Sequence, residues 1–199
     1  MKYPKLRELR EAIKALIKGP YTSRFPYEAH KPYERFRGKP EFHEDDCVGC
    51  GACFQVCPAG AIEMIDLKGK RVLTIHWDVC ISCGQCQANC LTEKGIILSQ
   101  EFDLATTEDR GALKQEIKKD LVFCGCCGEV VAPRDQLLWV AKKLGPLVFS
   151  NATLMLSYLQ QLNLALKEEP SLKQDDEFAR SERIRILCPR CRRQVVLKS

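Results

Sequence analysis

The chain has 199 residues, of which 13 are cysteine, and a formal net charge of +5. This length allows one domain with an appendage or two small domains. Charge interrupts the apolar residues of 1–20 and no small-residue cleavage site follows, which argues against a signal peptide and a disulfide-rich secreted protein. No stretch approaches the 18 uncharged apolar residues of a membrane-spanning helix.

The N-terminal segment is expected to form an amphipathic helix followed by an extended arm. Apolar residues recur at helical spacing over 5–18, and Gly19-Pro20 should end the helix. Residues 20–42 are rich in proline and aromatic side chains but have no periodicity. Residues 1–39 carry eleven Lys or Arg against four Asp or Glu, whereas the rest of the chain is nearly neutral. We therefore assign residues 1–42 to a basic helix and docking arm.

Residues 43–100 contain an internal repeat. Four cysteines recur 33 residues later, so that Cys47, Cys50, Cys53 and Cys57 correspond to Cys80, Cys83, Cys86 and Cys90. Each quartet precedes a short apolar stretch, 61–65 or 95–98, that is expected to be a strand, and residues 71–75 should form another strand after a turn at 68–70. Two facing halves predict a pseudo-symmetric α+β domain.

The spacing of these eight cysteines is typical of two 4Fe–4S clusters. Three closely spaced thiolates can surround one cluster, while the fourth, on the following turn, reaches the other cluster. One cluster should therefore take Cys47, Cys50, Cys53 and Cys90, and the other Cys80, Cys83, Cys86 and Cys57. Structural zinc sites use two separated cysteine pairs rather than tandem quartets. The second quartet lacks the proline that follows Cys57, which should alter access or potential near the Cys90 ligand.

A second cysteine-containing unit is expected at residues 121–199, after a polar connector at 101–120 with a short helix near 109–119. Apolar stretches at 121–123 and 184–187 lead into Cys124-x-x-Cys127 and Cys188-x-x-Cys191, as strands lead into metal knuckles. Helices are expected at 134–144 and 151–166, the second capped by Ser150 or Asn151. The charge-dense residues 167–183 should form a linker.

The C-terminal thiols predict a third metal site. Cys124, Cys127, Cys188 and Cys191 fit one tetrahedral ion, for which we favour zinc, with mononuclear iron as the alternative. Cys126 is interpreted as a free thiol, and His43 and His76 as surface or packing residues. We find no phosphate-binding loop, nucleotide fingerprint or nucleophile–base pair, so the chain is expected to be non-catalytic.

The two quartets, preceded by Phe36-Arg37-Gly38-Lys39-Pro40, resemble the eight-iron subunit shared by complex I and energy-converting membrane-bound nickel–iron hydrogenases. The C-terminal cysteine pairs resemble the corresponding subunit of formate hydrogenlyase. This resemblance implies an electron relay through two 4Fe–4S clusters, with catalytic and membrane subunits and an electron donor protein as partners. It also implies a peripheral position on the cytoplasmic side of the cell membrane, where the helix at 5–18 could lie on the bilayer or a membrane subunit.

Two other functions remain open from the sequence. A free soluble ferredoxin-type carrier would use the same clusters but would not need the basic arm. A nucleic-acid-binding protein with structural clusters could use the C-terminal knuckles, although the near-neutral charge outside the arm argues against nucleic acid as a partner.

Overall fold

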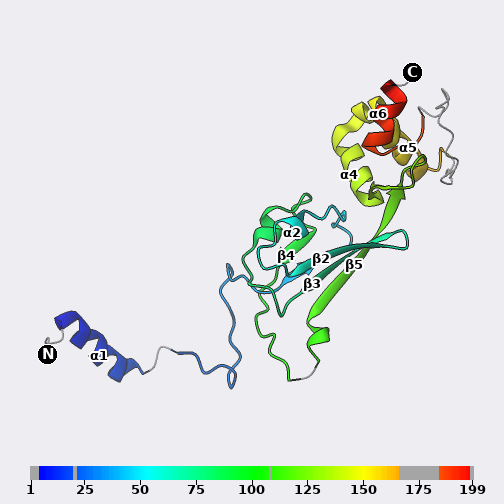
Figure 1. Cartoon of the computed structure of the whole chain (residues 1–199). Coiled ribbons are helices and arrows are strands. Elements are labelled where there is room, and N and C mark those ends of the chain that lie inside the picture. The colour runs from blue at the N-terminus through cyan, green and yellow to red at the C-terminus, as the bar shows by residue number, and fades with distance from the viewer. Residues whose placement is uncertain (1–4, 20–21, 108, 166–183, 198–199) are drawn as a thin grey trace. The chain divides into compact units, whose positions relative to one another are not determined.

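The computed structural model describes residues 5–19, 22–107, 109–165 and 184–197. The backbone divides into two compact units, Met1–Phe36 and Arg37–Ser199 (Figure 1). The charge-dense linker expected at 167–183 lies outside the described residues.

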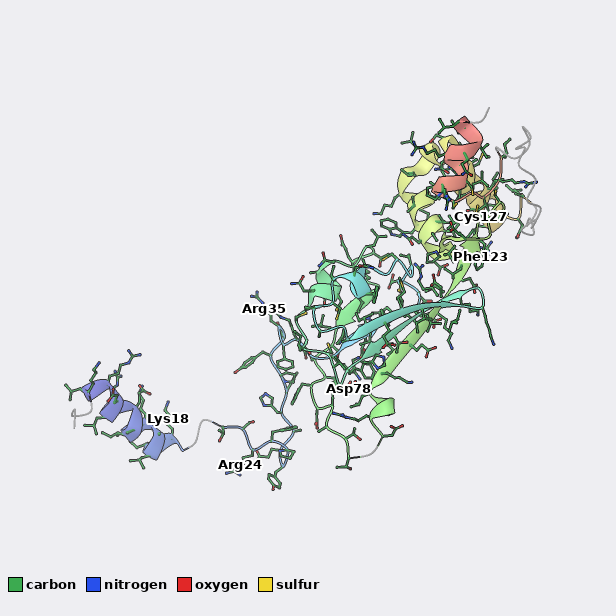
Figure 2. The ribbon with its side chains drawn as sticks, in the orientation of Figure 1. Lys18, Arg24, Arg35, Asp78, Phe123 and Cys127 are labelled. Carbon is green, nitrogen blue, oxygen red and sulfur yellow. The ribbon has the colours of Figure 1, made fainter. Side chains whose placement is uncertain are left out.

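The first unit contains the expected amphipathic helix, α1 (Leu6–Lys18). The Glu8 carboxylate accepts a hydrogen bond from the Lys5 backbone N–H, and Gly19, with φ of 78°, ends the helix. No residue of α1 is buried, and its apolar stripe of Leu6, Leu9, Ile13, Leu16 and Ile17 is exposed. Figure 2 labels the basic side chains Lys18, Arg24 and Arg35 along this unit.

The second unit contains two antiparallel sheets. A four-stranded sheet has the order β2 (Ile62–Leu67), β3 (Lys70–His76), β5 (Lys114–Phe123) and β6 (Val130–Pro133). A two-stranded sheet joins β1 (Pro40–Phe42) to β4 (Ile96–Leu98). The strands expected at 61–65, 71–75 and 95–98 are therefore confirmed. Positive φ values at Lys68 and Gly69 turn β2 into β3, as a tight hairpin requires.

Two short helices follow the two cysteine loops. Both α2 (Ala52–Gln55) and α3 (Gln85–Ala88) start after a glycine in the left-handed conformation, Gly51 with φ of 78° and Gly84 with φ of 81°. These glycines are 33 residues apart, so the sequence repeat has a counterpart in the backbone. Strand β1, which the sequence placed within the arm, pairs with β4 and lies with this part of the fold.

The prediction of a short helix near 109–119 is wrong. A single 3₁₀ turn, η1 (Arg110–Ala112), is followed by the long strand β5, which pairs with β3 from His76 opposite Lys114 to Lys70 opposite Asp120. Alternation explains the difference: Ile117 and Lys119 are buried, whereas the residues between and beside them are exposed. The expected boundary between connector and C-terminal unit thus falls inside one strand.

The C-terminal part is helical. Its helices are α4 (Arg134–Leu144), the 3₁₀ helix η2 (Gly145–Ser150), α5 (Ala152–Gln161) and α6 (Pro189–Leu197). Helices α4 and α5 confirm the two expected helices, although α5 ends before residue 166. Asn151 is the cap, because its Oδ1 accepts hydrogen bonds from the backbone N–H groups of Thr153 and Leu154.

The strand expected at 184–187 is wrong, because these described residues have no regular secondary structure. They are held by individual hydrogen bonds and by burial of Leu187: the Ile186 carbonyl accepts a hydrogen bond from the Gly125 N–H, and the backbone of Leu187 bonds the Thr153 hydroxyl. Residues after Cys188 form α6, whose Val195 packs into a buried cluster with Cys124, Cys188 and Cys191. A second buried cluster joins the sheet residues Leu73, Ile75 and Ile117 to Cys47, Cys53 and Cys86.

Among the described residues, no helix is both long enough and apolar enough to cross a bilayer.

Candidate metal centres

Two cavities separate the eight cysteines into two groups of four. Cavity A is lined by Cys47, Cys50, Cys53 and Cys90, and cavity B is lined by Cys57, Cys80, Cys83 and Cys86. Each cavity thus combines three cysteines of one quartet with the last cysteine of the other. Including the space at their mouths, they measure about 300 Å³ and 380 Å³ respectively. Much of this space opens to solvent, so it is the grouping of the cysteines, rather than the volume, that marks the two candidate sites.

Apart from the cysteines, most residues in the walls of both cavities are apolar. Cavity A is lined by residues that include Phe42, Val48, Leu73 and Ile96. Cavity B is lined by residues that include Ala61, Ile62, Ile75 and Leu98. Apart from Val48 and Ala61, which lie in loops, these side chains come from β1, β2, β3 and β4, so both sheets contribute to the two walls. Such walls limit the access of water and so influence the reduction potential of a bound iron–sulfur group.

Backbone N–H groups approach several of the thiols. The Ala61 N–H lies 3.3 Å from Cys57 Sγ, and the Ser82 N–H lies 3.4 Å from Cys80 Sγ. Hydrogen bonds of this kind to ligand sulfurs help to set cluster potentials. Burial is the main cause that raises the pKa of Cys53, to about 12, and that of Cys86, to about 11. These thiols therefore keep their protons at neutral pH unless a bound metal displaces them.

Sequence reasoning assigned no role at the cysteine loops to three cations that the structure places beside them. The Arg37 guanidinium donates to the Cys83 carbonyl at 2.9 Å, next to cavity B. The Arg71 guanidinium donates to the Gly49 carbonyl at 3.2 Å and pairs with Asp66. The Lys119 ammonium donates to the Glu44 carbonyl at 2.6 Å. The alternating pattern of the strand places Lys119 on the same face as the buried Ile117, which could have predicted its burial. A lysine in a sequence is normally expected to face solvent, however, and this hides the pattern.

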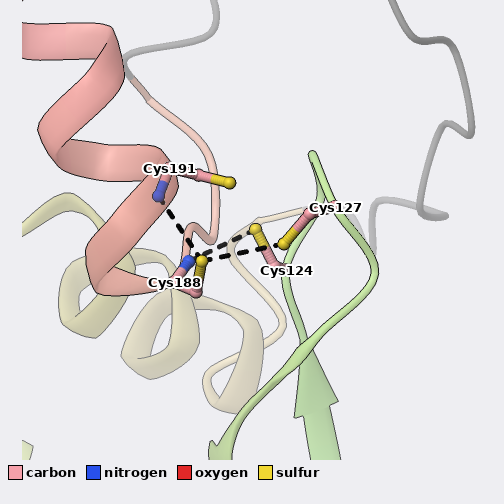
Figure 3. Close-up of side chains that lie close together, drawn as sticks. All are labelled: Cys124, Cys127, Cys188 and Cys191. Carbon is pink, nitrogen blue, oxygen red and sulfur yellow. Dashed lines mark hydrogen bonds between the residues drawn. The ribbon is translucent and has the colours of Figure 1, made fainter.

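The four C-terminal cysteines come together as expected from the sequence. Their sulfur atoms lie within 4.8 Å of one another (Figure 3), although Cys127 and Cys188 are 61 residues apart. The distance from Cys127 Sγ to Cys188 Sγ is 3.7 Å. A tetrahedral ion with ligand distances of ~2.3 Å separates its sulfurs by roughly 3.8 Å, which this spacing matches. The geometry therefore fits one ion.

Backbone hydrogen bonds further define this site. The Cys188 N–H donates to Cys124 Sγ at 3.3 Å, and the Cys191 N–H donates to Cys188 Sγ at 3.5 Å. Burial alone would raise the pKa of Cys124, but backbone N–H groups of Cys127, Cys188 and Cys126 outweigh it and lower this pKa to about 7. Cys124 is thus disposed toward the thiolate form that binds metal.

The remaining candidates lie outside these three groups. Cys126 is partly buried against the C-terminal cluster but is not one of the four converging cysteines. The backbone of His43 pairs with Gly95 and Cys47, while its side chain is exposed. The Nε2 atom of His76 lies 3.5 Å from a carboxylate oxygen of Glu63.

Comparison with known proteins identifies similar iron–sulfur proteins and subunits of respiratory complexes. The family described as a 4Fe-4S dicluster domain matches residues 41–98. The chain is 36% identical to formate hydrogenlyase subunit 6 of Escherichia coli over 127 residues, which cover 63% of this chain and 70% of that protein. It is 35% identical to NAD(P)H-quinone oxidoreductase subunit I of Thermosynechococcus vestitus over 118 residues, which cover 53% of this chain and 55% of that protein.

A solved structure was also found, that of the membrane-bound sulfane sulfur reductase, an archaeal respiratory membrane complex. One of its chains is 32% identical to this chain, with a TM-score of 0.40. The match covers 55% of this chain and 60% of that one, so this chain spans only part of the length of several of its relatives.

Proposed function

Because this chain belongs to the family of two-cluster iron–sulfur subunits that includes formate hydrogenlyase subunit 6, we propose that it relays single electrons within a membrane-associated respiratory complex. The complex is hydrogenase-like or complex-I-like, and its catalytic and membrane subunits, with an electron donor protein, are the partners of this chain. The chain itself binds and positions the clusters, and the terminal reaction takes place on another subunit.

The observation that carries this proposal is the distribution of eight cysteines between two apolar cavities. Cavity A would hold a cluster on Cys47, Cys50, Cys53 and Cys90, and cavity B would hold one on Cys57, Cys80, Cys83 and Cys86. The left-handed glycines before α2 and α3 give both loops the same turn, which supports two pseudo-symmetric halves. Each bound cluster would accept and donate one electron at a time.

The protein's own contribution is to hold these clusters in a dry environment of fixed polarity. Apolar side chains of the two sheets would exclude water, while backbone N–H groups would donate hydrogen bonds to ligand sulfurs. Because strands β1, β3 and β4 each contribute residues to both cavities, one folded domain would fix the separation of the two clusters.

Iron and sulfide content tests the proposal directly. Protein purified without oxygen should carry ~8 cluster irons and ~8 acid-labile sulfides per chain, because eight thiolates bind two cubes. Both quantities should be measured together with electron paramagnetic resonance spectra of the reduced protein. A reconstituted protein that never exceeds four irons would exclude two clusters.

We also propose a structural metal ion, zinc in preference to mononuclear iron, at Cys124, Cys127, Cys188 and Cys191. Its ligands come from the turn after β5 and from the start of α6, so the ion would join two segments that are distant in sequence. The short sulfur separations favour one ion rather than a cluster. A structural ion of this kind contributes directly to folding.

Replacing Cys188 by serine should release this ion and loosen the C-terminal helices. We expect the variant to lose one metal ion per chain and to be cleaved faster by protease within residues 121–191, while it retains both clusters. Elemental analysis and timed proteolysis measure the two effects, and Cys126→Ser is the matched control because Cys126 lies outside the group of four. Unchanged metal content and cleavage in Cys188→Ser would contradict a shared site.

The first unit is proposed to attach the relay to its complex. Its helix exposes an apolar stripe and carries basic side chains, which suits contact with a membrane subunit or with anionic lipid headgroups. We place the chain peripherally on the cytoplasmic side of the membrane, where free thiols remain available for metal binding.

A further inference from the structure

Lys119 is a buried cation at the junction between the cluster domain and the C-terminal unit. Its side chain is only 9% exposed, and its ammonium lies 2.9 Å from the Asp135 carboxylate. The same ammonium donates a hydrogen bond of 2.6 Å to the carbonyl of Glu44. Lys119 belongs to β5, whereas Asp135 lies in the first turn of α4. The pair therefore connects the loop before Cys47 to the first C-terminal helix.

The loop that contains Cys47 and Cys50 packs directly against this lysine. A Cβ atom at Gly49, which has φ of 69°, would lie 3.0 Å from Lys119 Cγ and 3.3 Å from Pro133 Cγ. Only glycine accommodates both this conformation and this contact. The side chain of Lys119 therefore lies against the loop that carries Cys47 and Cys50, two of the four cysteines of cavity A.

We propose that Lys119 raises the reduction potential of the cluster in cavity A and that Asp135 limits this effect. The inference rests on the proposed binding of a cluster by Cys47, Cys50, Cys53 and Cys90. Reduction adds one negative charge to a cluster, so a nearby cation stabilises the reduced state and a nearby anion destabilises it. Charges that are largely removed from water interact more strongly than exposed ones, which favours Lys119 as a determinant.

Because Asp135 belongs to the C-terminal helix α4, the Lys119–Asp135 pair would also link the C-terminal helices to the cluster in cavity A. Another cation beside this loop, Arg71, has its carboxylate partner Asp66 on the same hairpin, so that pair does not depend on the C-terminal unit. Asp135, in contrast, is presented by α4, which packs on α5 and β5. The position of α4 would therefore influence the potential of the cluster in cavity A.

Potentiometric titrations of the full-length wild-type protein and four variants test the inference. Lys119→Met should shift the one-electron reduction equilibrium of the cavity A cluster about tenfold toward the oxidised form, which corresponds to a potential about 59 mV lower. Asp135→Asn should shift the same equilibrium in the opposite direction, because the lysine loses its counter-charge. Lys119→Arg should restore most of the wild-type value. Lys118→Met is the control, since Lys118 is an exposed neighbour on the other face of β5.

The opposite signs distinguish charge from structure. If the substitutions merely loosened the loop, the reduction potential would shift in the same direction in Lys119→Met and Asp135→Asn, or the iron content would change. An electrostatic effect leaves the iron content constant. The inference would be overturned if the reduction equilibrium constant of the cavity A cluster changed less than twofold in Lys119→Met, or if Lys119→Met and Asp135→Asn shifted it in the same direction. Either result would leave the relay function intact. A wild-type protein without two reducible clusters would instead refute the proposed function itself.

Discussion

Replacing Cys57 by serine should remove the cluster of cavity B, although Cys57 belongs to the first quartet in the sequence. In the structure, Cys57 lines cavity B together with Cys80, Cys83 and Cys86, because it lies beyond α2, after the turn of chain that surrounds cavity A. The reciprocal change, Cys90→Ser, should remove the cluster of cavity A. Each variant should retain ~4 of ~8 irons, since each keeps one complete set of four thiolates.

Spectra of the two variants identify which cluster is lost. Paramagnetic resonance of the reduced proteins should give complementary signals, each of them one component of the wild-type spectrum. Cys83→Ser provides the internal reference, because Cys83 lines cavity B and should produce the same spectrum as Cys57→Ser. If Cys57→Ser instead resembled Cys50→Ser, a cluster would be bound by each quartet alone, and the crossed arrangement would be wrong.

The grouping of the cysteines at the candidate metal centres was the most predictable part of the molecule. Four cysteines repeated at a constant offset restrict the local backbone so strongly that their spacing alone indicates the crossed pairing of the quartets. The C-terminal group was predictable for the same reason, although a long insertion separates its two halves. Helices α4 and α5 were also predictable, the second because Asn151 is a good cap.

Tertiary context determined the elements that sequence reasoning missed. The polar residues of β5 resemble an exposed helix or connector, and they form a strand because β3 offers a free edge beside them. The apolar residues 184–187 resemble a strand but have no strand partner among the described residues, and they are held by Gly125 and Thr153 instead. The burial of Lys119 could not be predicted either, because it depends on contacts with Glu44 and Asp135, which are distant in sequence.

Deleting residues 1–35 should leave both clusters spectroscopically normal but abolish incorporation into the membrane complex. This segment is almost entirely the first compact unit, whereas every cluster cysteine belongs to the second. In α1, Leu6, Leu16 and Ile17 are 86%, 85% and 80% exposed. An apolar stripe of this extent on a basic helix marks a contact surface for a partner or a membrane.

A pair of substitutions tests the stripe without removing the arm. Leu9→Glu combined with Ile13→Glu places two carboxylates in the apolar stripe, where burial against a partner would leave them unpaired and costly. Ala15→Glu combined with Lys18→Gln changes the net charge equally on the opposite side of the helix and is the matched control.

Co-purification with the membrane fraction, measured beside cluster spectra, should fall at least tenfold for the stripe variant and remain near the wild-type level for the control. Electron flow to the catalytic subunit should stop in parallel, while the isolated relay can still be reduced. Full assembly and activity of the truncated chain would show that the arm is dispensable, and would favour a free soluble carrier instead.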